Sequence, residues 1–398
     1  MTKRILFVDD EVSVLEGLQN LLRKQRRRWD MVFVTSGADA LTELQRGPFD
    51  VIVSDMRMPG MDGAALLTKV KERHPSVARV VLSGHAEQDA LVRALPVAHQ
   101  FMSKPCDAEA LRVAIERTCN LQVLLHDETI RKIVGKLDKL PSVPRTYVEL
   151  AAAIARPTTG LADLGAIVEK DPAMSAKVLQ LVNSAYFGLP QRISSIRQAV
   201  LYLGSELLRG LALTAHVFAC SRDVALDGFS LDRLQEDSLI TARLARRFLP
   251  DRTKAEEVFT AAIVHDIGTI VLVQGMTDAY AEVLRITEES DAPIHEVERT
   301  ILGTTHAEVG AYLLGVWGLP FPIVEAVAYH HTPSEVTEGT RDVLGALHVA
   351  TVLVRRAKAG RRRVDVDHAF LTAAGLAPRL PAWEAMAADE LSVIARAG

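Results

Sequence analysis

Five short apolar runs rich in β-branched residues, separated by segments with helical periodicity, dominate the first 105 residues of the chain. Short runs of this kind predict buried strands, and the helical segments between them predict the crossovers that parallel strands require. We therefore expect a small α/β domain built on a doubly wound parallel sheet. The predicted strands are Ile5–Val8, Met31–Val34, Val51–Ser54, Val80–Leu82 and Gln100–Met102.

Helical periodicity continues almost throughout the chain after Leu140-Pro141, which predicts a second, all-α domain. A chain of 398 residues is long enough to build more than one core. Between the two domains, the stretch from Cys106 to Val134 contains no Gly or Pro and predicts one long helix. This helix could connect the domains, and an ordinary terminal helix followed by a linker is the alternative.

Charged and hydroxyl side chains lie where four of the predicted strands end. Asp9 and Asp10 follow the first strand, Asp55 ends the third, Ser83 ends the fourth and Lys104 follows the fifth. Because the carboxyl ends of parallel strands share one edge of the sheet, we expect these side chains to meet there. A single Asp after a strand is more often a turn residue or a helix cap, but the five positions together favour a site.

Phosphoryl transfer to a carboxylate is the chemistry that suits this set. Crowded carboxylates repel one another unless a hard cation lies among them, and Mg²⁺ prefers oxygen ligands. Asp55 can then act as the nucleophile, while the metal ion and Lys104 neutralise charge on the transferring group. Ser83 is placed to hydrogen-bond a phosphoryl oxygen.

Residues 1 to about 120 resemble the receiver domain of bacterial response regulators. The motifs that carry the resemblance are Val8-Asp9-Asp10-Glu11, Ser54-Asp55-Met56-Arg57-Met58-Pro59-Gly60-Met61-Asp62-Gly63, Leu82-Ser83-Gly84 and Lys104-Pro105. The resemblance implies a flavodoxin-like sheet with strand order 2-1-3-4-5 and phosphorylation of Asp55 by a sensor histidine kinase. It also implies Mg²⁺ bound by Asp10, Asp55 and the Met56 carbonyl, with Asp9 assisting, and a cis peptide bond before Pro105. Phe101 stands at the position of the family's switch aromatic, for which an ordinary core role is the alternative.

Residues 137 to 340 resemble the HDOD domain, a helical relative of the HD-type metal phosphohydrolases that is generally regarded as lacking their activity. The segments that carry the resemblance are Leu140–Pro144, Asp171–Met174, Val182–Gly188 and Ala199–Gly204. Helix capping by Asn183-Ser184 and a helix stop at Leu203-Gly204 would explain two of these segments by structure alone.

Five residues of this second half are of the kinds that bind transition metals: His265, Asp266, His306, His330 and His331. His265-Asp266 is the HD dipeptide, which we expect on a helix. If the five side chains converge, imidazole and carboxylate together suit Fe, Mn or Zn. The alternative is a degenerate site whose histidines hydrogen-bond across helices in a domain that serves as a scaffold for other signalling proteins.

Several positions depart from the catalytic HD pattern. Asp237 stands where HD hydrolases place their first histidine, and Thr351 where they place a final aspartate. Thr269 replaces the lysine of the cyclic-dinucleotide phosphodiesterase branch, and Thr332-Pro333 stands in place of that branch's Gly-Tyr-Pro loop. These departures argue against cleavage of cyclic di-GMP and favour an output domain that is not an enzyme.

Composition and the remaining motifs argue against other classes of protein. Three cysteines without CxxC spacing indicate reduced thiols in a cytoplasmic protein. We find no targeting signal and no uninterrupted apolar run of membrane-spanning length, so we expect no membrane partner. The basic clusters Arg26-Arg27-Arg28 and Arg355-Arg356 through Arg361-Arg362-Arg363 have no recognisable DNA-binding motif beside them, so nucleic-acid binding is not expected.

We therefore expect a two-component response regulator with four segments: a receiver over 1–120, a connecting helix over 106–136, an HDOD domain over 137–340 and a C-terminal helical extension over 341–398. Its expected partners are a sensor histidine kinase and downstream signalling proteins that the HDOD domain binds, with homodimerisation through the connecting helix as a further hypothesis. The main alternative is a phosphorylation-gated, metal-dependent phosphohydrolase acting on a nucleotide.

Overall fold

A computed structural model of the chain divides into two compact units. The first comprises residues 1–139, 180–192 and 315–318, and the second comprises residues 140–179, 193–314 and 319–398. The structure describes residues 2–83, 94, 97–104, 109, 111–116, 128–137, 140–142, 144–154, 156, 158–183, 192–213, 218–220, 226–290, 292–336, 341–359 and 365–397.

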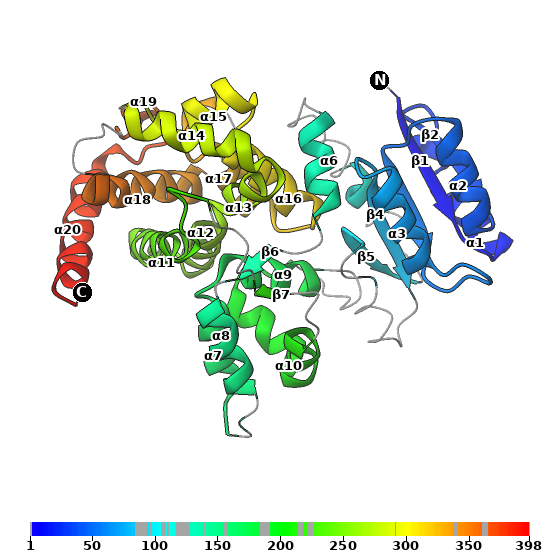
Figure 1. The fold of residues 1–398 in the computed structure, drawn as a ribbon, viewed down its shortest axis with the longest axis horizontal. Helices are drawn as coiled ribbons and strands as arrows, with labels where there is room; N and C mark the ends of the chain where they lie inside the picture. The colour runs from blue at the N-terminus through cyan, green and yellow to red at the C-terminus, as the bar shows by residue number, and fades with distance from the viewer. Residues whose placement is uncertain are drawn as a thin grey trace. The chain divides into compact units, whose positions relative to one another are not determined.

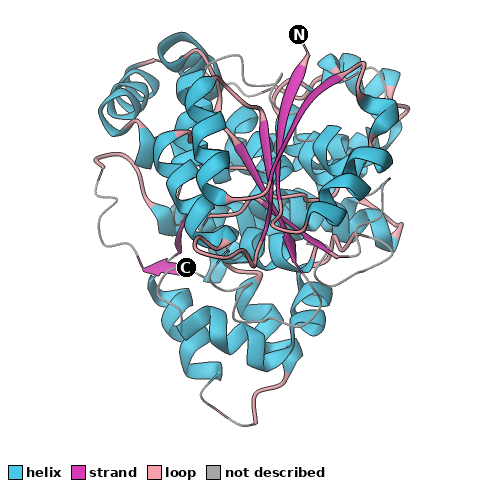
Figure 2. Cartoon of the chain, turned by 90° about the vertical axis from the view of Figure 1, so that its right-hand side faces the viewer, coloured by secondary structure: helices cyan, strands magenta, loops and turns pink. Residues whose placement is uncertain are grey.

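A five-stranded parallel sheet forms the centre of the first unit, with its strands drawn in magenta in Figure 2. The strands are β1 (Lys3–Val8), β2 (Trp29–Val34), β3 (Val51–Asp55), β4 (Ala78–Ser83) and β5 (Gln100–Ser103). They are ordered β2-β1-β3-β4-β5, and every neighbouring pair is parallel. The expected fold class and strand order are therefore confirmed.

Helices cover both faces of this sheet. They are α1 (Val12–Leu21), the 3₁₀ turn η1 (Arg23–Gln25), α2 (Gly37–Arg46) and α3 (Gly63–Arg73). The inward side chains of β1 and β3 pack on Leu15 and Leu18 of α1 and on Leu111 and Ile115 of the helical residues 111–116. On the other side, α2 and α3 contact each other and the strands, as Figure 1 shows. The continuous apolar runs of the strands follow from burial on both faces.

Much of the predicted connecting helix lies outside the described residues. Of the range 106–136, the structure describes residue 109, the helical residues 111–116 and residues 128–136, which form α6 (Glu128–Lys136). Whether one unbroken helix joins these parts stays a prediction.

The second unit is mainly helical. Apart from the last residues of α9 (180–182) and of α16 (315–316), which belong to the first unit, it comprises β6 (Leu140–Ser142), α7 (Pro144–Ile154), α8 (Leu161–Val168), α9 (Pro172–Val182), α10 (Ile196–Leu213), β7 (Phe218–Cys220), α11 (Leu231–Phe248), α12 (Arg252–Val264), α13 (Ile267–Gly275), α14 (Thr277–Glu289), α15 (Ile294–Leu302), α16 (His306–Val316), α17 (Phe321–Tyr329), η3 (Pro333–Glu335), α18 (Arg341–Ala359), α19 (His368–Ala373), η4 (Ala377–Arg379) and α20 (Leu380–Ala397).

Helices α11, α12 and α18 pack together at the core of this unit (Figure 1). The consecutive helices α12 and α13 span 24 residues, and the most apolar 18-residue window of this stretch has a mean hydropathy of 1.6, enough by length and composition alone to cross a membrane. In the structure, 78% of the most apolar window of this stretch is buried inside the unit, as is usual for a core helix of a soluble protein.

Two local features of the second unit differ from what the sequence predicted. Leu140–Ser142 pairs in parallel with Phe218–Cys220 as a short two-stranded sheet, which the helical pattern did not predict. The helix stop expected at Leu203-Gly204 is a break within α10, because Gly204 adopts φ 72° and ψ 169° and the chain then resumes a helix.

Candidate functional site

The carboxyl edge of the sheet brings together an ammonium group and two carboxylates from three strands. The Lys104 Nζ lies 2.6 Å from Asp9 Oδ2 and also pairs with Asp55 Oδ1. Asp9 follows β1, Asp55 ends β3 and Lys104 follows β5, so the parallel arrangement places all three at one edge. Asp9 is 1% exposed and the Asp55 side chain 8%, so charge attraction acts here with little screening by water.

Backbone groups of the loop that follows β3 pack closely around Asp55. The Arg57 N–H donates to Asp55 Oδ2 at 2.6 Å, and the Gly63 N–H donates to the Met56 carbonyl at 3.0 Å. A Cβ on Gly63 would overlap the Asp55 carbonyl oxygen, so only glycine permits α3 to start this close to the strand end. Burial raises the pKa of Asp55, although Lys104 and the Arg57 N–H oppose the shift.

Of the other residues expected at this site, the structure describes the side chains of some but not of others. Asp10 is exposed beside Asp9, and Phe101 is 3% exposed on β5. Ser83 ends β4 as expected, but its side chain lies outside the described part of the chain, as do Gly84 and Pro105. The structure therefore brings together Asp9, Asp55 and Lys104.

This edge has the donor chemistry that Mg²⁺ requires. Asp9 and Asp55 reach the same ammonium group, so their oxygens already converge on one position. The Met56 carbonyl oxygen and the exposed Asp10 carboxylate lie on the two adjoining loops. Carboxylate and carbonyl oxygens fit a hard divalent cation.

The HD dipeptide lies in a turn and not on a helix, which corrects our expectation. His265 is the C-cap of α12 and Asp266 the N-cap of α13. His265 Nδ1 lies 2.7 Å from the Ala262 carbonyl of the preceding helical turn. From this turn the Asp266 carboxylate comes within 3.2 Å of His306 Nε2 and 4.0 Å of His330 Nε2.

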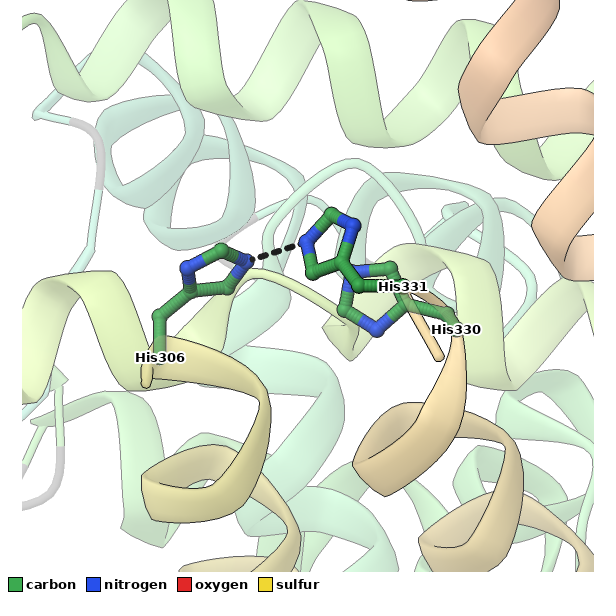
Figure 3. A group of neighbouring side chains, drawn as sticks. All are labelled: His306, His330 and His331. Carbon is green, nitrogen blue, oxygen red and sulfur yellow. Dashed lines mark hydrogen bonds between the residues drawn. The ribbon is translucent and has the colours of Figure 1, made fainter. Parts of the chain in front are cut away.

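The structure brings the four expected histidines together around Asp266. Asp266 Oδ2 lies 3.0 Å from His265 Nε2. Asp266 Oδ1 lies 3.2 Å from His306 Nε2 and 4.0 Å from His330 Nε2. His331 Nε2 lies 3.0 Å from His306 Nε2 (Figure 3). His306 begins α16, whereas His330 and His331 follow the end of α17.

The histidines of this cluster are oriented with their Nε2 atoms inward. The Nδ1 atoms of His265 and His330 lie 2.7 Å and 2.8 Å from backbone carbonyls, and carbonyls only accept, so both Nδ1 atoms carry protons. The proton of each neutral ring then lies on Nδ1, so each Nε2 atom has a lone pair that can bind a metal ion. Among the described residues, the buried His330 Nε2 has no hydrogen-bond partner.

These donors fit a transition metal ion. The ligand atoms of His265, Asp266 and His330 lie within 4.8 Å of one another, and so do those of His306, His330 and His331. Imidazole nitrogens outnumber carboxylate oxygens, which suits Fe, Mn or Zn better than Mg²⁺.

Electrostatics divides the cluster into charged and neutral members. Burial opposes charge at His306, but Glu298 and Asp266 raise the pKa of His306 to about 9. Burial and the neighbouring histidines hold the pKa values of His330 and His331 well below the usual range of histidine. Burial also opposes charge at Asp266, yet His265, His306 and Arg355 hold the pKa of Asp266 well below its usual range.

Sequence reasoning missed four residues of this site: Tyr280, His295, Glu298 and Arg355. Glu298 contacts His306, and Tyr280 contacts Glu298. His295 stacks on His331 with ring centroids 4.2 Å apart, and Arg355 Nη2 lies 3.5 Å from Asp266 Oδ1. The spacing of His295 and Glu298 on one helical face was the only available signal for these two.

Asp237 and Thr351, two of the departures from the catalytic HD pattern, differ in their surroundings. Asp237 pairs with Lys358, and its side chain is 40% exposed. Thr351 is 3% exposed on α18, and its Oγ1 has no hydrogen-bond partner within the described parts of the chain. Arg355 follows Thr351 by one helical turn and brings a guanidinium group to the cluster.

Two protein-family models match the chain. The model of the response regulator receiver domain matches residues 5–116, and the model of the HDOD domain matches residues 140–333. An uncharacterized protein of Treponema pallidum (strain Nichols) is 24% identical over 252 residues, which cover 63% of this chain and 48% of that protein. The DNA-binding transcriptional regulator NtrC of Escherichia coli (strain K12) is 40% identical over 83 residues, which cover 21% of this chain and 18% of NtrC. The chain thus spans about half or less of the length of these curated relatives.

Solved structures show a similar fold at low sequence identity. The MmoQ response regulator from Methylococcus capsulatus (strain Bath) is 22% identical with a TM-score of 0.50, covering 62% of this chain and 98% of that one. A virulence factor (cj0248) from Campylobacter jejuni subsp. jejuni is 18% identical with a TM-score of 0.52, covering 65% of this chain and 97% of that one. At these identities the likeness concerns the fold alone.

Proposed function

Because the chain joins a response regulator receiver domain to an HDOD domain, a combination that fits a two-component response regulator, we propose that Asp55 accepts phosphate from a sensor histidine kinase and thereby controls the HDOD domain. A receiver domain implies a phosphodonor such as this kinase. The observation that carries the proposal is the convergence of Asp9, Asp55 and Lys104 at the carboxyl edge of the sheet.

The reaction assigns one role to each of these side chains. An Asp55 carboxylate oxygen attacks phosphorus, the bond between phosphorus and the donor atom breaks, and the donor keeps the bonding electrons. Lys104 neutralises negative charge on the phosphoryl oxygens as they arrive. Asp9, Asp10, Asp55 and the Met56 carbonyl would hold Mg²⁺, which supplies further charge neutralisation when bound.

The switch that follows uses the neighbouring strands. Ser83 at the end of β4 would hydrogen-bond the new phosphoryl group, and Phe101 on β5 would change its rotamer with the loop that follows Ser83. The change then passes along the 106–136 segment and alters what the HDOD domain binds. We place the protein in the cytoplasm, where its kinase and downstream signalling partners would meet it.

The test is labelling of the full chain with acetyl phosphate and Mg²⁺, followed by detection of the acyl phosphate. Asp55→Asn should abolish the label, because an amide cannot form it. Asp62→Asn is the matched control, since Asp62 caps α3 by accepting from the Ala65 N–H and Asn caps a helix equally well. Labelling that survived Asp55→Asn would overturn the proposal.

We also propose that the histidine cluster of the HDOD domain holds one divalent transition metal ion of the Fe, Mn or Zn class. The inward Nε2 atoms and the Asp266 carboxylate support this. Elemental analysis of purified protein should find about one such ion per chain, with His265→Ala losing it. Loss of nucleotide hydrolysis together with the metal would favour the alternative of a phosphorylation-gated phosphohydrolase.

A further inference from the structure

A fully buried carboxylate lies behind His306, on the side away from Asp266. Glu298 on α15 is 0% exposed. Its Oε1 accepts from the Tyr280 hydroxyl at 2.8 Å, and its Oε2 accepts from His306 Nδ1 at 2.6 Å and from the His306 backbone N–H at 2.9 Å. Burying a carboxylate is costly unless hydrogen bonds satisfy its oxygens, and in this protein both oxygens are satisfied.

Glu298 fixes how His306 presents its ring. A carboxylate can only accept, so His306 Nδ1 must carry a proton. The ring is then held with Nε2 facing Asp266 Oδ1 at 3.2 Å and His331 Nε2 at 3.0 Å. A donor atom held in this way needs no reorientation when a cation binds.

The position of His306 explains why a carboxylate is needed there. His265 and His330 each follow a helix and use a carbonyl three residues earlier, from Ala262 and Val327. His306 instead begins α16, so no preceding turn of that helix can offer a carbonyl. Glu298 reaches it from α15 and also accepts the first backbone N–H of α16.

A carboxylate has a second effect that a carbonyl lacks. Its full negative charge makes the imidazole that it holds more basic and strengthens that imidazole's bond to a metal ion. Of His265, His306 and His330, His306 is therefore the one whose donor strength depends on a side chain that substitution can change.

We propose that Glu298 is a positioning residue that sets the affinity of the histidine cluster for a divalent transition metal ion, through the orientation and basicity of His306. The inference rests on the proposed metal site. Tyr280 supports Glu298 by holding its other oxygen.

The test is a titration of the full chain with Co²⁺, followed by the visible absorption of the bound ion, so that no activity is needed. Glu298→Gln should weaken Co²⁺ binding by about 10–100-fold, because the amide keeps the shape but loses the charge. Glu296→Gln is the matched control, since Glu296 lies on the same helix and is exposed. It should bind Co²⁺ like the wild type.

Two further measurements separate positioning from a purely structural role. Thermal unfolding shows whether Glu298→Gln is folded, and the imidazole ¹⁵N chemical shifts show whether His306 keeps its Nδ1 proton. If Glu298→Gln does not fold, Tyr280→Phe decides, because it removes one hydrogen bond to Glu298 and should weaken Co²⁺ binding several-fold.

The outcomes are distinct. A folded Glu298→Gln, or failing that a folded Tyr280→Phe, that binds Co²⁺ as the wild type does would overturn the role of Glu298 while leaving the metal site intact. A wild-type chain that binds no Co²⁺ would overturn the metal site and this inference together. Labelling of Asp55 is independent of both results.

Discussion

Gly268 and His306 lie in such close contact that a Cβ on Gly268 would overlap the carbonyl oxygen of His306. Gly268 is in the first turn of α13, just after Asp266, and His306 begins α16. The missing side chain lets the two helices approach until Asp266 and His306 can meet. The close packing of α13 against α16 therefore also brings together residues of the histidine cluster.

Gly268→Ala should destabilise the second unit by about 3 kcal/mol or more, because the methyl group meets backbone atoms that cannot rotate away. Urea unfolding of the full chain would measure this. Gly17→Ala is the control: Gly17 lies on α1 with no atom near its Cβ position, so alanine should stabilise by roughly 0.5–1 kcal/mol. A neutral Gly268→Ala would show that the helices can separate without cost.

Phosphorylation of Asp55 should slow as the pH falls. Burial raises the pKa of Asp55, so the protonated carboxyl, which is not a nucleophile, persists to higher pH than in a free aspartate. The initial rate of acyl phosphate formation should drop as the pH passes downward through this raised pKa. Lys104→Met should move the drop to still higher pH, because the Lys104 ammonium opposes the shift. A rate that held constant down to the ordinary aspartate range, about pH 4, would contradict this.

Arg355 should compete with a metal ion for Asp266. Its guanidinium lies 3.5 Å from Asp266 Oδ1 and is only 25% exposed, so its charge acts directly on the cluster. Arg355→Gln should tighten Co²⁺ binding about tenfold, which corresponds to ~1.4 kcal/mol. Arg356→Gln, which removes the neighbouring charge from a surface pair with Asp365, should change little. Weaker binding in Arg355→Gln would instead mean that Arg355 helps to hold the site open.

Phe101 should respond to phosphorylation if it is a switch. It is 3% exposed on β5, so either a switch or an ordinary core role is compatible with its burial. A ¹⁹F label on Phe101 should shift its resonance when acetyl phosphate and Mg²⁺ are added to the full chain. A label on Phe33, which stacks on Phe7 with ring centroids 4.8 Å apart, should not shift. Two unmoved resonances in a phosphorylated sample would leave Phe101 as a core residue.

The first unit could be predicted from the sequence because its information is local. An apolar run buried on both faces indicates a strand wherever it occurs, and parallel strands must end at one edge of a sheet. These two rules placed Asp9, Asp55 and Lys104 together without knowledge of any long-range contact. The helical nature of the second half followed from periodicity in the same way, although the short β6–β7 pair did not.

Only the tertiary structure decided the histidine cluster. Helical periodicity shows which face of a helix is buried, but not which other helix it meets. The turn at His265-Asp266, the carboxylate of Glu298 behind His306 and the guanidinium of Arg355 beside Asp266 each depend on packing between helices far apart in the chain. The physical reason is that a hydrogen bond between distant helices leaves no periodic trace in the sequence, whereas a strand or a helix does.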